Sequence, residues 1–146
     1  MRVHHMAGHL IRRLNQISTS AFTQRMQERG VDLTQVQFAA MDAIATFPGI
    51  DQAGVAAKIA YDRATIGGVI DRLEQKGYIS RLVSKQDRRA RVLRLTKMGE
   101  RLFEEMLPEI TDLQDDILTG LNQAERDRFL KLARKAVGPL SEDALS

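Results

Sequence analysis

Residues 62–96 decide the fold of this chain, and they read DRATIGGVIDRLEQKGYISRLVSKQDRRARVLRLT. Within them, residues 76–94 hold seven basic side chains and a single acidic one, Asp87. Two short segments of alternating apolar and polar residues flank the polar turn 84–90, and this pattern predicts a β-hairpin. A hairpin with arginines at its tip suits contact with a polyanion such as DNA. The alternative is a charged hairpin that only faces solvent.

The stretch before the hairpin carries apolar residues at helical spacing. They fall at i, i+3, i+4 and i+7, namely Ile66, Val69, Ile70 and Leu73. Asp62 can cap the start of this helix and Gly77 can end it. A shorter helix, capped by Asp51, precedes it across a turn at residues 60–61. Helix, turn, helix and hairpin in this order predict a winged helix-turn-helix, whose second helix enters the major groove of DNA.

The side of this second helix that faces away from the core is the expected DNA-binding face. Its candidate contact residues are Arg63, Ala64, Thr65, Gly67, Gly68 and Arg72. Arg63 can donate two hydrogen bonds to guanine, and Thr65 can bind a base or a phosphate. The two glycines cost about 2 kcal/mol relative to two alanines. We interpret them as allowing close approach to the groove, although the pair can instead loosen the helix or admit a neighbouring side chain.

The hairpin supplies the second set of expected DNA contacts. Its candidate residues are Lys85, Asp87, Arg88, Arg89 and Arg91. Arg89 is the best placed to enter a narrow minor groove, where the negative potential is enhanced. Asp87 is interpreted as a carboxylate that holds an arginine fork in one geometry.

The rest of the chain is expected to be helical, within a single domain of residues 1–146. Further helices are expected from about residue 6 to Gly30 and after the N-cap residues Thr34, Thr96 and Asn122. Pro108 is expected to kink or divide the helix that follows Thr96. The first and last helices keep apolar residues on more than one face, so they need partners beyond one small domain.

Residues 87–96 resemble the D-x-R-x-x-x-x-x-L-T wing signature of the MarR (multiple-antibiotic-resistance regulator) family, and residues 62–80 resemble its recognition helix. The resemblance implies a mainly α fold with a small β-hairpin wing. It places a winged helix-turn-helix lobe at 34–96 and dimerisation helices at 1–33 and 97–146. It also implies a homodimer that binds palindromic operator DNA and usually represses transcription. By position, Arg89 would be the minor-groove arginine.

The same resemblance implies release of DNA when a small aromatic anion binds near the dimerisation helices. The expected effector-binding residues are His9, Arg12, Arg13, Gln16, Phe38 and Met41. Residues 11–18 resemble the branch of the family that responds to aromatic carboxylates or their coenzyme A thioesters.

Ordinary structural roles compete with each of these effector assignments. Arg12 and Arg13 can face solvent or pair with acids such as Glu104, Glu105 or Asp112, and Phe38 and Met41 can belong to the core. His5 and His9 are spaced i, i+4 and could share a metal ion. Two histidines with no cysteine nearby are too few ligands for a protein metal site, so no metal is expected.

Composition excludes several classes of protein. There is no cysteine, which removes disulfides and thiol redox switches. No apolar run approaches the roughly 20 residues of a membrane span, and a cytoplasmic protein is expected. No catalytic constellation or phosphate-binding glycine loop is present, so neither enzymatic activity nor a cofactor is expected. The main alternative function is a winged-helix module that binds an acidic protein partner and lacks sequence-specific DNA binding.

Overall fold

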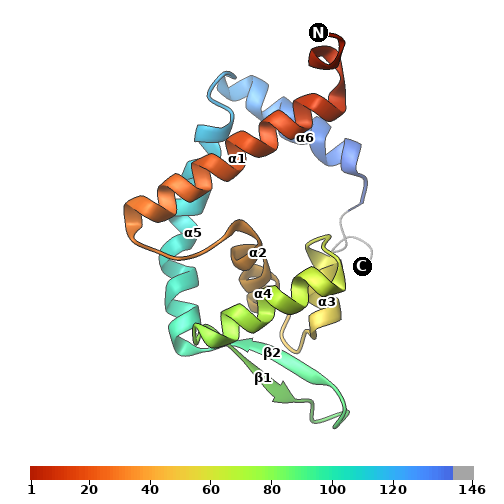
Figure 1. Ribbon diagram of the computed structural model, residues 1–146, viewed down its shortest axis with the longest axis vertical. Helices are drawn as coiled ribbons and strands as arrows, with labels where there is room; N and C mark the ends of the chain where they lie inside the picture. Colours follow the sequence, from red (N-terminus) through yellow and green to blue (C-terminus); the bar gives the residue numbers. More distant parts are fainter. Residues whose placement is uncertain (140–146) are drawn as a thin grey trace.

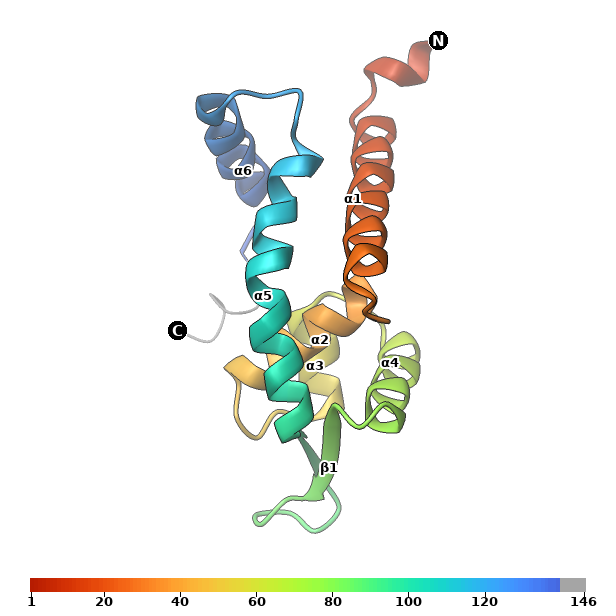
Figure 2. The same cartoon turned by 90° about the vertical axis from the view of Figure 1, so that its left-hand side faces the viewer.

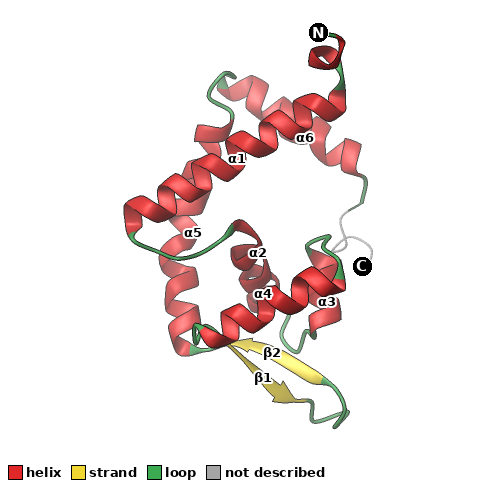
Figure 3. Ribbon diagram, in the orientation of Figure 1, coloured by secondary structure: helices red, strands yellow, loops and turns green. Residues whose placement is uncertain are grey.

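The computed structural model describes residues 1–139, and Figures 1 and 3 show a helical protein with one small hairpin. The elements follow in the order η1 (Arg2–His5), α1 (Ala7–Arg29), α2 (Gln35–Thr46), α3 (Gln52–Lys58), α4 (Arg63–Gln75), β1 (Ile79–Val83), β2 (Arg91–Leu95), α5 (Lys97–Ile117) and α6 (Gln123–Val137). Among these residues, no helix has the length and apolarity that crossing a membrane requires.

The N-cap residues expected from the sequence all form their caps. The side chains of Thr34, Asp51, Asp62, Thr96 and Asn122 each accept a hydrogen bond from the backbone N–H three residues further on. The division of α5 at Pro108 is wrong, because the helix runs unbroken from Lys97 to Ile117. Met106 and Ile110, on either side of the proline, are both buried in the core, and this burial favours a helix that continues across the proline.

The hairpin is anchored at its base and free at its tip. Ile79 pairs with Leu95 and Val83 with Arg91 in an antiparallel register. Ile79 and Leu93 are buried, and the Leu93 N–H donates to the carbonyl of Ile50 over 2.9 Å. The far end of the hairpin therefore projects from the lobe as a wing (Figure 2).

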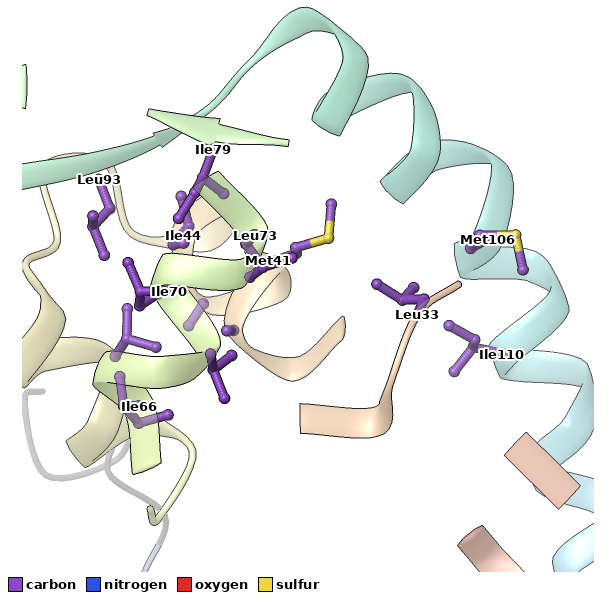
Figure 4. Packing of buried hydrophobic residues seen from close by; sticks show 14 of the residues in the cluster. Leu33, Met41, Ile44, Ile66, Ile70, Leu73, Ile79, Leu93, Met106 and Ile110 are labelled. Carbon is purple, nitrogen blue, oxygen red and sulfur yellow. The ribbon is translucent and has the colours of Figure 1, made fainter. Parts of the chain in front are cut away.

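One hydrophobic core joins α2, α4, both strands and α5. Figure 4 shows Ile66, Ile70 and Leu73 of α4 facing Met41 and Ile44 of α2. Ile79 and Leu93 from the strands join this cluster. Leu33, before α2, reaches the buried Met106 and Ile110 of α5, so the core continues from the wing to the long helix.

The turn between α3 and α4 contains Ala60 in the left-handed conformation, with φ of 58°. The Tyr61 N–H donates to the carbonyl of Ala56, which is the hydrogen bond of a Schellman helix end. Glycine is preferred at such a position, because a Cβ there costs about 1–2 kcal/mol.

We therefore expect Ala60→Gly to stabilise the protein by about 0.5 kcal/mol, after the larger backbone entropy of glycine in the unfolded chain is subtracted. Urea denaturation measures this change. Ala57→Gly, the same substitution inside α3, is the control and should destabilise by about 1 kcal/mol. A loss of stability for Ala60→Gly would contradict the assigned strain.

The end of the molecule that carries α6 and the start of α1 exposes apolar side chains. In α1, Leu10, Ile11 and Ile17 are exposed, whereas Phe22 and Met26 further along are buried. In α6 no residue is buried, and Val137 is 69% exposed. Figures 1 and 2 place this end opposite the wing. The expectation that the terminal helices keep uncovered apolar surface in a single chain is confirmed.

Candidate DNA-binding surface and the hollow beside α1

The first turn of α4 is exposed and is fixed by its cap. Arg63, Ala64 and Thr65 all face solvent. The carboxylate of Asp62 accepts hydrogen bonds from the Thr65 backbone N–H over 2.7 Å and from its hydroxyl over 2.8 Å. These two bonds hold the pKa of Asp62 below its ordinary value. The Thr65 proton is thus committed to the cap, and its oxygen is left to accept a hydrogen bond from a ligand.

The two glycines of α4 have different surroundings. A Cβ added to Gly68 would meet nothing within 4 Å, and this residue is exposed. A Cβ added to Gly67 would lie 3.3 Å from Nε2 of Gln52, the first residue of α3. Gly68 therefore suits close approach of a groove wall. Gly67 instead matches the alternative in which a glycine admits a neighbouring side chain.

The wing turn is built by Ser84 and Asp87. The Ser84 hydroxyl accepts from the backbone N–H of Gln86 over 3.2 Å, and Oδ1 of Asp87 accepts from the backbone N–H of Arg89 over 2.9 Å. The interpretation of Asp87 as the partner of an arginine fork therefore needs correction. Its carboxylate contacts Arg89 through the backbone, because an aspartate side chain readily accepts from the backbone N–H two residues further on and so closes the turn.

Two of the seven cations counted between residues 76 and 94 are partly buried by contacts with other elements of the fold. Lys76 donates to the carbonyl of Asp32 over 2.8 Å and to Oε1 of Gln37 over 3.1 Å. Arg81 forms ion pairs with two acids of α4. The five that remain are exposed: Lys85, Arg88, Arg89, Arg91 and Arg94. The sequence count overstated the cationic surface because the partners come from other elements.

The recognition helix and the wing share one end of the molecule. Both views of the ribbon place α4 and the hairpin away from the N-terminus (Figures 1 and 2). Arg63 and Arg72 on α4 are exposed, as are the five cations of the wing. This end is therefore a candidate surface for a polyanion.

A hollow of about 730 Å³ lies beside α1, next to the C-terminal part of α5. Its lining residues are Arg13, Gln16, Ile17, Ser20, Ala21, Gln24, Arg25, Glu28 and Asp116. Arg13 and Gln16 are thus brought together at one hollow. Among the lining residues, Arg25 and Asp116 form an ion pair over 3.3 Å across the two helices.

The other expected effector residues lie elsewhere in the single chain. Met41 has no exposed surface and belongs to the core, and Phe38 stacks on Phe103 of α5 with 5.2 Å between ring centroids. Arg12 is exposed on α1, outside the hollow. The His9 ring lies 5.4 Å from that of His4. Residues 1–139 contain no cluster of three or more side chains suited to hold a metal.

The acids of α5 pair with arginines that the sequence reading did not single out. Arg25 contacts Glu109 over 2.8 Å and Asp112 over 3.0 Å, and Arg29 also pairs with Glu109. Arg12 and Arg13 are both exposed, as the solvent-facing alternative expected. The pairing of either with Glu104, Glu105 or Asp112 is wrong, because α1 meets α5 nearer its own C-terminus. Arg25 and Arg29 lie four residues apart on α1, and this spacing opposite an acidic helix is the sequence pattern that could have predicted these ion pairs.

The exposed first turn of α4 and the cationic wing define a winged helix-turn-helix protein of the class that regulates transcription. Residues 33–90 match the model of the MarR family. The chain is 32% identical over 135 residues to the transcriptional regulator HosA of Escherichia coli, covering 92% of this chain and 97% of HosA. The chain belongs to the MarR family of transcriptional regulators, as its wing signature indicated.

Two further relatives are informative about regulation. The transcriptional repressor NicR of Pseudomonas putida is 32% identical over 89% of this chain and 81% of its own. BpsR of Bordetella bronchiseptica, whose DNA binding is regulated by 6-hydroxynicotinic acid, has a similar solved structure. Its TM-score is 0.85 at 32% identity, covering 92% of this chain and 95% of BpsR.

Proposed function

We propose that the protein is a dimeric repressor that binds palindromic operator DNA and releases it when a small aromatic carboxylate binds beside α1. The observation that carries the DNA-binding part is the exposure, at one end of the fold, of the first turn of α4 together with five cations of the wing. Arg63 and Thr65 lie where a recognition helix meets base edges, and Arg89 lies in the wing turn.

The dimer is supported by the apolar surface at the opposite end. Leu10 and Ile11 on α1 and Leu130 and Leu132 on α6 are each close to half exposed or more. Burying such side chains is favourable at about 25 cal/mol per Å² of apolar area, which a second copy of this end would provide. A two-fold dimer would present its recognition helices to successive major grooves about 34 Å apart, hence a palindromic operator.

The effector proposal rests on the hollow beside α1. Arg13 borders it, and an arginine fork suits a carboxylate with two parallel hydrogen bonds. The regulation of BpsR by 6-hydroxynicotinic acid favours a free aromatic acid over a coenzyme A thioester. The name of NicR as a repressor supports repression as the mode of action. Arg25 borders the same hollow and braces α1 against α5, so a ligand there can alter how the two helices meet.

Two titrations test the proposal. The purified protein should bind DNA from upstream of its own gene with sequence specificity, and an aromatic acid such as 6-hydroxynicotinic acid should raise its melting temperature and weaken that binding. Arg13→Ala should lose the ligand response while keeping DNA binding. Stabilisation by no aromatic acid would refute the effector, and a complex no tighter than with random DNA would refute the operator.

A second function is favoured by one observation on the wing. Leu82 and Val83 of β1 are 42% and 53% exposed beside the cationic turn, a combination that suits an acidic protein partner with an apolar patch. The absence of any sequence-specific DNA complex would favour this reading.

The role of Asp87 gives a prediction that separates two mechanisms. Asp87→Asn keeps an oxygen that can accept the Arg89 N–H and removes a negative charge near DNA, so we expect operator affinity equal to the wild type or higher. Asp87→Ala loses the turn hydrogen bond and should weaken binding. Fluorescence anisotropy with labelled operator DNA measures both. Weaker binding by Asp87→Asn would show that the carboxylate charge itself is required.

A further inference from the structure

Arg81 of β1 contacts both helices of the helix-turn-helix. Its guanidinium lies 2.5 Å from Oδ1 of Asp71 and 2.9 Å from Oε1 of Glu74, both on α4. It also donates to Oε1 of Gln52, the first residue of α3, over 3.5 Å. The hydrogen bond with Asp71 raises the pKa of the guanidinium, against the opposing effect of burial. One side chain therefore ties wing, recognition helix and supporting helix together.

The glycine at position 67 belongs to the same arrangement. Nε2 of Gln52 lies 3.3 Å from where a Cβ of Gly67 would stand, so the missing side chain leaves room for the amide against α4. The other end of that amide accepts from Arg81. The network thus continues from the wing, through Arg81 and Gln52, to the middle of the recognition helix.

We propose that Arg81 is a positioning residue for DNA reading, which holds the wing at a fixed setting relative to α4 through Asp71, Glu74 and Gln52. This inference rests on the proposed operator binding. In a DNA duplex, the major groove that α4 would enter and the adjacent minor groove that the wing would enter lie at a fixed separation. A wing held in place engages both together, whereas a loose wing loses conformational entropy when it docks. The side chain of Arg81 is only 26% exposed and is paired with acids, so Arg81 is not among the proposed DNA contacts.

A purely electrostatic role makes a different prediction. Without Arg81, two uncompensated carboxylates of α4 would repel phosphates, so weaker binding by Arg81→Ala fits either role. Asp71→Asn separates them because it removes a negative charge beside DNA. Electrostatics predicts tighter binding by this variant, and positioning predicts weaker specific binding.

The experiment measures the affinity of each variant for operator DNA, taken from upstream of the protein's own gene, and for random DNA. Both affinities are measured across a range of salt concentrations. We expect Arg81→Ala and Asp71→Asn each to lose about tenfold in operator affinity for each protomer, comparable to the loss of one base contact, and so about 100-fold for the dimer. The salt dependence should stay unchanged, because no phosphate contact is removed. Arg81→Lys should recover part of the loss, since an ammonium replaces the charge but not the two-pronged geometry.

Exposed Arg94 of β2 provides the control. Arg94→Ala removes the same charge from the hairpin and should weaken binding to operator DNA and to random DNA alike.

Hydrogen exchange without DNA gives an independent readout. Arg81→Ala should speed amide exchange in β1 and β2 while leaving the core amides of α2 unchanged. Unchanged hairpin exchange, tighter operator binding by Asp71→Asn, or a reduced salt dependence in Arg81→Ala would each overturn the inference. If Arg81→Ala speeds hairpin exchange but the wild type shows no preference for operator DNA, Arg81 does hold the wing in place and the proposed function is refuted.

Discussion

Gly99→Ala is expected to destabilise the protein by about 3 kcal/mol, a large part of the stability of a domain this size. A Cβ at this position in the first turn of α5 would lie 2.0 Å from the carbonyl oxygen of Tyr78. That oxygen is held in place, because it accepts the Thr96 N–H over 3.0 Å. The Thr96 hydroxyl also donates to the carbonyl of Gly77 over 2.6 Å and accepts from the Gly99 N–H over 3.0 Å.

The added methyl group therefore meets the backbone of Tyr78, and no side-chain rotation relieves the overlap. The first turn of α5 must move away from the exit of α4, which breaks the hydrogen bonds of Thr96 and shifts the wing. Urea denaturation should show a lower midpoint, and operator binding should fall at temperatures where the variant is still folded. Gly120→Ala is the matched control, because a Cβ there meets nothing within 4 Å. Equal midpoints for the two variants would mean that the backbone adjusts at little cost.

Gly99 also shows where sequence reasoning stops. The caps at Asp62 and Thr96 were predicted, because a cap joins residues three apart and leaves a local signature. The hairpin was predicted for the same reason, from alternation and a polar turn. The contact between Gly99 and Tyr78 joins two elements that only the tertiary fold brings together, and no local pattern marks it.

The charged residues of the candidate site show the same difference between features that a local pattern predicts and contacts that only the tertiary fold creates. Exposure of Arg63 and Arg89 followed from the apolar stripe of α4 and from the polar wing turn. The commitment of Arg81 to Asp71 did not follow, because it depends on how closely β1 packs against α4. Met41 was named for an effector pocket and lies fully buried in the core, since periodicity identifies a buried face without telling a cavity wall from a packed interior.

Arg89→Ala is expected to have the largest effect on DNA binding of any single wing substitution. The turn hydrogen bond from Arg89 to Asp87 uses only the backbone, so alanine keeps the shape of the turn and removes the exposed guanidinium alone. Each protomer would lose one cation from a minor groove, where the potential is strongest. At about 1–2 kcal/mol for each protomer, the dimer should bind roughly 30- to 1,000-fold more weakly.

The salt dependence of binding shows whether this loss comes from direct contact. Arg89→Ala should reduce the slope of log affinity against log salt by about one counterion for each protomer. Arg2→Ala, which removes an exposed cation of η1 at the opposite end of the molecule, should leave the slope unchanged. The unfolding midpoint of Arg89→Ala should equal that of the wild type, because the side chain is exposed. A wild-type slope together with full operator affinity in Arg89→Ala would remove Arg89 from the DNA-binding surface and leave α4 as its main element.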